Sequence, residues 1–165
     1  MFEVEEYIVY GANGVCRVAE ICASPFDPLD ERLFYVLKPA GDRGNSVIYT
    51  PVDNETVRMR PLLSKPAVDG LLSRVSELPV LDVPVERQRK EVYKSTMASV
   101  DPELYFRLLK TVYTRRETAR EKKKRLPEMD NEYEFLAKKS LYTELSLVLG
   151  IAEAEVEGYL ADRIG

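Results

Sequence analysis

The amino-acid sequence predicts an α+β protein, in which a small antiparallel β-barrel over residues 1–61 precedes an all-α helical domain over residues 62–165. Two observations predict this fold class. Short apolar segments separated by turn residues fill the first sixty positions, whereas apolar residues recur at intervals of three and four through most of the rest. The composition, with 45% hydrophobic and 32% charged residues, is typical of a globular protein rather than a disordered chain.

Five short segments of the first domain are expected to be strands, because β-branched and aromatic residues fill them and turn residues separate them. The expected strands are residues 4–10, 15–21, 33–37, 46–50 and 57–60. Turns or loops are expected at 11–14, 24–30 and 39–45, where glycine, proline and asparagine gather. Residues 33–37 have no polar face, which predicts a covered central strand. Five strands at this spacing favour a strongly bent barrel.

Capping residues mark the helices of the second domain. Ser64 is placed to cap a helix that begins near Pro66. Asp101 precedes a proline and a glutamate, which together predict the start of a long helix. Asp130 is expected to cap the next helix, and Gly150 is expected to end it.

A basic helix over residues 85–98 and a last helix over residues 153–162 complete the expected domain. The apolar stripe of the long helix stops near Tyr113. Its basic end, from Arg115 to Arg125, is therefore expected to be exposed and frayed.

The sequence offers no catalytic residue set, and we expect no enzyme activity, cofactor, metal or small-molecule substrate. Histidine is absent, which removes the commonest general base and a common metal ligand. Cys16 and Cys22 are too few for a zinc site, and in one continuous strand they would stand about 20 Å apart, beyond disulfide reach. The turn at 11–14 leads into a strand and lacks the lysine of a phosphate-binding loop. A hydrolase built on carboxylates alone is the least favoured interpretation.

The chain is expected to be a cytoplasmic protein without membrane contact. No apolar run approaches the roughly 20 residues that a membrane span needs. The N-terminus is acidic and lacks the basic region and apolar stretch of a secretory signal.

Charge is concentrated in one part of the chain. The net charge is −4, yet residues 85–125 carry 13 Lys and Arg against 6 Asp and Glu. On a helix, Arg87, Lys90 and Lys94 share one side, and Arg89 lies about 60–100° from it. Such a row can contact successive phosphates of a nucleic acid. A solvated helix face with Glu–Lys pairs explains the same charges, and both interpretations stand at this point.

Several stretches of the sequence form a recognisable series: YIVYGANGV at 7–15, YVLK at 35–38, YTPVDN at 49–54, VRMRPL at 57–62, LLKTV at 108–112 and the pattern AxxxLxxEL from 137 to 145. Taken in order, they resemble the CarD/CdnL family of bacterial transcription regulators, whose first domain also occurs in the transcription-repair coupling factor. Their order and spacing cover nearly the whole chain.

The resemblance implies a Tudor-like barrel that binds the RNA polymerase β subunit, and a helical domain that contacts upstream promoter DNA and stabilises the open complex. The polymerase-facing strand, which can pair with a strand of its partner, is expected to contain Val47, Ile48, Tyr49 and Thr50. The residues expected to contact DNA phosphates are Arg87, Arg89, Lys90 and Lys94.

The chain departs from the family pattern at several positions. The family carries a tryptophan wedge at the start of the basic helix, whereas this chain contains no Trp and has Pro84, Val85 or Glu86 there. Gly11 replaces the usual proline after the tyrosine, and Asn13 replaces the usual histidine. Because an inserted apolar wedge kinks a base step, its loss makes polymerase binding a stronger expectation than DNA wedging.

Two other functions fit the same sequence. The first is a polymerase-binding protein that has lost DNA contact and acts only through protein partners. The second is an RNA- or ribosome-associated adaptor that uses the barrel as a nucleic-acid surface. Duplex affinity that falls steeply with salt separates the leading interpretation from the first of these.

Overall fold

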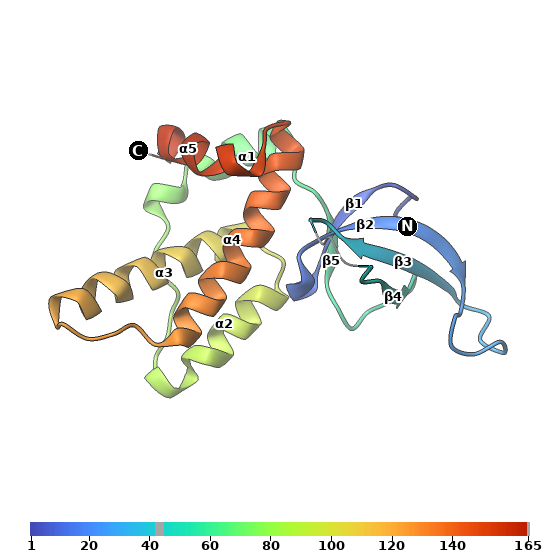
Figure 1. Cartoon of the computed structure of the whole chain (residues 1–165), viewed down its shortest axis with the longest axis horizontal. Coiled ribbons are helices and arrows are strands. Elements are labelled where there is room, and N and C mark those ends of the chain that lie inside the picture. The colour runs from blue at the N-terminus through green and yellow to red at the C-terminus, as the bar shows by residue number, and fades with distance from the viewer. Residues whose placement is uncertain (42–44, 165) are drawn as a thin grey trace.

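The structure is a computed structural model that describes residues 1–41 and 45–164 of the 165-residue chain. A β-sheet lies at one end of the molecule and the helices lie at the other, with the two termini far apart (Figure 1). The predicted α+β class and the order of sheet before helices are confirmed. The turn predicted at 39–45 includes residues 42–44, which lie outside the described residues.

The first unit is one five-stranded antiparallel sheet. Its strands are β1 (Tyr7–Tyr10), β2 (Val15–Ala23), β3 (Leu33–Pro39), β4 (Ile48–Pro51) and β5 (Met59–Pro61), paired in the order β4-β3-β2-β1-β5. Within the described residues β4 and β5 are the two edges and do not pair with each other, so a closed barrel is not confirmed. The register shifts between Val18 and Glu20, an irregularity that bends a strand.

The first strand begins later than predicted. The chain turns at Glu5, which has a φ of 76°, and β1 starts at Tyr7 rather than at residue 4. The Glu5 N–H donates to the Val18 carbonyl at 2.6 Å. The apolar alternation that suggested a strand from residue 4 is therefore interrupted by a backbone conformation that the pattern did not reveal.

Gly11 occupies a position that admits no other residue without strain. It opens the short 3-10 helix η1 (Gly11–Asn13) between β1 and β2, with a φ of 49°. Its N–H donates to the Arg58 carbonyl at 2.9 Å, and a side chain at Gly11 would meet Cγ1 of Val57 at 2.7 Å. The predicted turn is confirmed, and close packing adds to the conformational reason for glycine.

Alternation along the strands turns one apolar face inward. The core of the β unit is Ile8, Tyr10, Cys16, Val18, Tyr35 and Leu37. Burial raises the pKa of the Cys16 thiol to about 11. Cys22 is half-buried, and both cysteines are free thiols.

Up to residue 164, where the description ends, the helical unit contains five α-helices and two short 3-10 turns. They are α1 (Lys65–Leu72), η2 (Val75–Glu77), η3 (Glu86–Gln88), α2 (Arg89–Ala98), α3 (Pro102–Glu121), α4 (Glu128–Leu149) and α5 (Glu153–Ile164). Three predicted helix ends are confirmed. Ser64 Oγ accepts from the Ala67 N–H at 3.2 Å, and Asp101 Oδ1 accepts from the Glu103 N–H at 2.9 Å. Gly150 ends α4 with a φ of 68°.

Two expectations for this unit are wrong. Residues 115–121 are not frayed, because the helix continues to Glu121 and Arg116 makes two hydrogen bonds of 2.9 Å to Glu134 of α4, whereas residues 122–125 are exposed and lie beyond the helix, as expected. Asp130 does not cap α4, which begins earlier, at Glu128. The Asp130 side chain is fully buried instead, among partners from other helices.

The helices enclose the larger of the two main apolar cores. Its fully buried large side chains are Tyr93, Met97, Tyr105, Leu108, Leu141 and Leu145. Among residues 1–41 and 45–164, no helix combines the length and the apolar character needed to cross a membrane.

The two units meet at a packed seam. Val9 and Val15 of the sheet contact Val100, which follows α2, and all three are at most 5% exposed. We call these three residues the valine seam. The chain itself crosses between the units over a short segment, since β5 ends at Pro61 and α1 begins at Lys65.

Candidate partner-binding surfaces

Strand β4 leaves one edge of the sheet open. The Val52 N–H donates a hydrogen bond to the Leu33 carbonyl at 2.9 Å, just beyond the paired residues of β3 and β4. Given the register of the two strands, this bond identifies Thr50 and Ile48 as the β4 residues that exchange backbone hydrogen bonds with β3. Because bonded and non-bonded pairs alternate along an antiparallel ladder, the N–H and C=O of Tyr49 point away from β3. Pro51 also faces outward but has no N–H to donate. Tyr49 is therefore the β4 residue that offers a full donor–acceptor pair to an added strand.

Aromatic side chains continue this open edge. Phe26, in the loop between β2 and β3, stacks edge-to-face on Tyr49 and Phe34, with ring centroids 5.6 Å and 6.0 Å away. Phe26 is 71% exposed, and Leu29 of the same loop is 88% exposed. Phe26 and Tyr49 are in contact, and Leu29 follows Phe26 by three residues in the same loop; exposed apolar groups on neighbouring segments are typical of a protein-binding surface. We call Phe26, Leu29 and Tyr49 the edge patch.

The loop that carries Phe26 is held by short-range hydrogen bonds. Ser24 Oγ accepts from the backbone N–H groups of Phe26 and Asp27, both at 3.2 Å. Asp30 forms a forked pair with Arg32, in which Nη2 lies 2.8 Å from Oδ2. The hydrogen bond from Arg32 lowers the pKa of the Asp30 carboxyl. A loop ordered in this way loses less conformational freedom when a partner binds.

Two of the four residues predicted to face the polymerase have accessible side chains. Val47 is 38% exposed and Tyr49 is 41% exposed. Thr50 is 2% exposed and Ile48 packs against the β core, because alternate residues of β4 point inward. Their side chains therefore support the sheet and are not available to a partner. The loop residues of the edge patch were not predicted, although apolar residues within a proline-containing loop are a usable signal.

A row of cations lies on the exposed side of α2. Arg87 in η3, and Lys90 and Lys94 in α2, are all exposed. Steps of three and four place them on one side of the helix. Within the part of the chain that the structure describes, none of the three forms an ion pair. We call these three residues the basic row.

The prediction that Arg89 contacts DNA phosphates is wrong, because Arg89 is buried away from the basic row. It is 7% exposed, and its Nε and Nη2 atoms donate to the Asp130 carboxylate, each at 3.2 Å. Arg89 also pairs with Glu86. A guanidinium that is buried and paired in this way is not available to a DNA phosphate.

Asp130 is the centre of a buried polar network. It is 0% exposed and accepts a hydrogen bond of 2.7 Å from the Tyr93 hydroxyl, besides those from Arg89. Arg115 of α3 bridges the same group, with Nε 3.2 Å from Asp130 Oδ1 and Nη2 2.8 Å from Glu86 Oε1. Two guanidinium groups thus balance two carboxylates. This Asp130 network fixes η3 and the start of α2, which carry Arg87 and Lys90 of the basic row, against α3 and α4.

Two buried phenols of the helical unit have raised pKa values. Burial and the hydrogen bond to Asp130 raise the pKa of Tyr93 far above its ordinary value. Burial raises the pKa of Tyr105 to about 12. Both groups stay protonated in the folded protein at a pH where the phenols of an unfolded chain ionise, near 10.

The free energy of unfolding is therefore expected to fall in alkali. Because the folded pKa is the higher one, the stability due to these phenols is complete below about pH 9 and decreases from about pH 10 through pH 12. Urea unfolding at pH 8, 10 and 11 measures this decrease, and Tyr105→Phe should make it shallower. Equal slopes for wild type and Tyr105→Phe would contradict the role given to this phenol.

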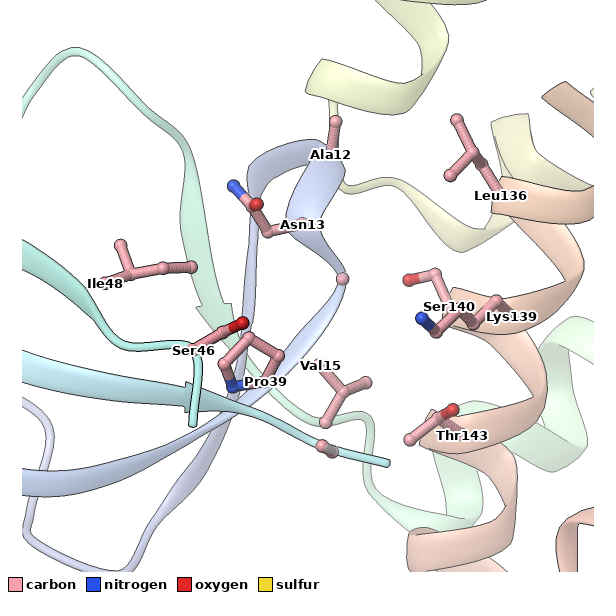
Figure 2. A pocket seen from close by; sticks show the side chains of 12 residues that line it. Ala12, Asn13, Val15, Pro39, Ser46, Ile48, Leu136, Lys139, Ser140 and Thr143 are labelled. Atoms are coloured by element: carbon pink, nitrogen blue, oxygen red, sulfur yellow. The ribbon is translucent and has the colours of Figure 1, made fainter. Parts of the chain in front are cut away.

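A crevice of about 370 Å³ lies between the sheet and α4. Figure 2 shows Leu136, Lys139, Ser140 and Thr143 of α4 on one side of it and Val15 and Pro39 of the sheet on the other. Its described lining includes one charged side chain, Lys139, and no carboxylate, thiol or imidazole. No group of three or more potential metal ligands occurs among residues 1–41 and 45–164.

Comparison with known proteins finds a family match over the sheet. Residues 2–63 match the family model described as CarD-like/TRCF RID domain. No curated protein matches the chain. The matched segment contains all five strands and the edge patch, whereas the basic row and the Asp130 network lie outside it.

Proposed function

We propose that this protein is a cytoplasmic transcription regulator that binds RNA polymerase through its β unit, because residues 2–63 match the family model described as CarD-like/TRCF RID domain. The observation that carries the proposal is the open edge of β4 inside the matched domain, where Tyr49 and the ordered Phe26 are exposed together. The bend in β2 supports a Tudor-like curvature of the sheet.

The proposed partner surface is an exposed strand of the polymerase β subunit. Such a strand would extend the sheet by bonding to the outward N–H and C=O of Tyr49. Phe26 and Leu29 would then be buried against apolar side chains of the partner, which adds to the binding free energy of the backbone pairing. Backbone pairing fixes the register, and the edge patch provides the specificity.

Replacing Tyr49 by Glu is expected to abolish most of the polymerase binding. The substitution places a charge in the edge patch and removes one of the two stacking partners of Phe26, so the affinity should fall tenfold or more, equivalent to about 1.4 kcal/mol. Pull-down of purified RNA polymerase by the tagged full-length chain measures the loss. Phe135→Ala is the matched control, because Phe135 is a 65% exposed aromatic residue of α4, outside the matched domain. Unchanged capture by Tyr49→Glu would contradict the assignment of this edge.

We further propose that the basic row contacts the phosphates of promoter DNA while the β unit is bound to the polymerase, and that this contact changes the stability of the open complex. The support is the exposure of Arg87, Lys90 and Lys94 on one side of α2. Val85 precedes η3 and is 41% exposed, so it is the accessible apolar residue nearest to the position of the family's tryptophan. No catalytic role is proposed.

The double variant Arg87→Ala, Lys90→Ala is expected to weaken duplex binding about equally for all sequences. Two lost phosphate contacts should reduce the slope of log K against log salt by about 1.8. Fluorescence anisotropy of a labelled duplex at several salt concentrations measures the slope. Lys65→Ala is the control, since Lys65 is an exposed lysine on α1, at the opposite end of the helical unit from α2 (Figure 1).

The outcomes of these two experiments separate the alternatives. Capture of polymerase without measurable duplex binding would favour a regulator that acts through protein contacts alone. Preference for structured RNA together with no capture of polymerase would favour an RNA- or ribosome-associated adaptor.

A further inference from the structure

One guanidinium, that of Arg60, joins the sheet to two separate helical elements. Arg60 lies in β5, the last strand before the helical unit. Its Nε donates to the Val100 carbonyl at 2.7 Å, directly after α2. Its Nη1 and Nη2 donate to the two carboxylate oxygens of Glu144 in α4, at 2.6 and 2.8 Å. The fork geometry of arginine is well suited to holding two groups in a fixed relation.

The carboxylate on the other side of this contact is almost fully buried. Glu144 is 2% exposed, and it accepts a third hydrogen bond from the Leu63 N–H at 2.9 Å. Leu63 belongs to the short segment between β5 and α1. The same carboxylate therefore binds both the edge of the sheet and the connecting segment. A buried charge with this many charge-assisted hydrogen bonds strongly favours one geometry over others.

The neighbouring valine seam contains a strained backbone. Val100 has a φ of 52°, a conformation that is a clear outlier for a β-branched residue. Its side chain is 5% exposed against Val9 and Val15, and its carbonyl is the acceptor for Arg60 Nε. Such strain persists only where the surrounding contacts over-determine the conformation. The α2–α3 connection is thus held to the sheet by both apolar packing and a hydrogen bond.

We propose that Arg60 and Glu144 are positioning residues that fasten the two units into one rigid body and so set the offset between the edge patch and the basic row. The inference rests on the proposed function, and it adds a reason why the contact of the edge patch with polymerase and the contact of the basic row with DNA act together. Arg60 touches neither surface. It acts through Val100, which fixes the C-terminal end of α2, while the Asp130 network fixes the other end.

The functional advantage of this arrangement is a high effective concentration. Once the β unit is bound, a rigid connection presents the basic row at one place and in one orientation. A second contact made in this way gains affinity without any new interaction, and a mobile connection loses much of that gain. The structure therefore links Arg60 and Glu144 to bridging of polymerase and DNA, but not to the binding of either partner alone.

The first test measures whether the units move together. In wild-type protein, ¹⁵N relaxation should give one rotational correlation time for the amides of β1–β5 and α2–α5. The double variant Arg60→Gln, Glu144→Gln removes both charges, so neither is left buried and unpaired. It should give different correlation times for the two units. A single shared correlation time in this variant would overturn the proposal. If the double variant does not fold, Arg60→Lys keeps the charge, loses the fork, and serves for the same measurement.

The second test measures bridging in the full-length chain. The double variant should bind purified polymerase, and separately a duplex, within about twofold of wild type, but its affinity for the polymerase–promoter complex should fall tenfold or more. The control is Glu5→Gln, Arg17→Gln, which removes an exposed ion pair of 2.8 Å within the β unit. Unchanged affinity for the polymerase–promoter complex would overturn the proposal. Wild-type protein that fails to bind polymerase would remove the proposed function and the bridging role together, while the relaxation experiment still decides whether Arg60 and Glu144 fasten the units.

Discussion

Replacing Asp130 by Asn is expected to lower the free energy of unfolding by about 3–5 kcal/mol, because it leaves the buried charge of Arg89 with only the exposed carboxylate of Glu86 as a partner. Asp130 is 0% exposed, and its carboxylate is shared by Arg89, Arg115 and the Tyr93 hydroxyl. The amide that replaces it carries no charge and directs two N–H groups toward donors. For a chain of this length the loss corresponds to a decrease in Tm of roughly 10 °C.

Urea unfolding followed by circular dichroism measures this effect. Glu132→Gln is the control, since Glu132 is an exposed carboxylate in the first part of the same helix, and a change within about 0.5 kcal/mol is expected there. Tyr93→Phe removes one hydrogen bond of the network and should cost about 1–3 kcal/mol. A loss below that of Tyr93→Phe in the Asp130→Asn variant would show that the carboxylate is not the centre of the network.

Introducing the family's usual proline at Gly11 is expected to destabilise this chain by about 3 kcal/mol or more. Proline fixes φ near −65°, whereas Gly11 has a φ of 49°. The substitution also removes the N–H that donates to the Arg58 carbonyl and places a side chain where Cγ1 of Val57 lies 2.7 Å from the Cβ position. All three effects act on the pairing of β1 with β5.

The matched control for Gly11→Pro is a glycine substitution that is expected to raise the free energy of unfolding rather than lower it. Gly70 lies inside α1, and a side chain there would meet nothing within 4 Å. Gly70→Ala is therefore expected to stabilise the protein by about 0.5–1 kcal/mol, because alanine loses less conformational entropy on folding. Thermal unfolding of both variants gives the comparison. A Gly11→Pro variant as stable as wild type would mean that the turn after β1 can adopt a different conformation in this chain.

The predictions from the sequence were most accurate for features that depend on neighbouring residues in the chain, such as helix ends. Ser64, Asp101 and Gly150 mark helix ends correctly, because capping depends on residues within one turn of the end. The strand segments were predicted from apolar alternation and from turn residues, with errors at the ends. The start of β1 was wrong because Glu5 adopts a positive φ that its residue type does not suggest.

The predictions that failed concern side chains whose position depends on contacts with residues far away in the chain. An aspartate before an apolar stripe has the pattern of a helix cap, but Asp130 is a buried counter-ion of Arg89, which is 41 residues away in the chain. Helical spacing alone places Arg89 between the exposed side of α2 and the side that packs on the other helices. Its side chain turns inward because the Asp130 carboxylate lies there. Phe26 was not predicted to belong to the partner-binding surface. Its ring stacks on Tyr49 while staying exposed, and this depends on the loop folding back over the sheet.

The burial of Cys16 makes the protein convenient to label. Burial raises the pKa of the Cys16 thiol to about 11, so at neutral pH this thiol stays in its unreactive protonated form. The second cysteine, Cys22, is half-buried on β2 and pairs across the strands with Phe34, whose ring contacts Phe26. A maleimide fluorophore on native protein should therefore attach at Cys22, beside the proposed docking edge. Its emission would then report the arrival of the polymerase without any engineered residue.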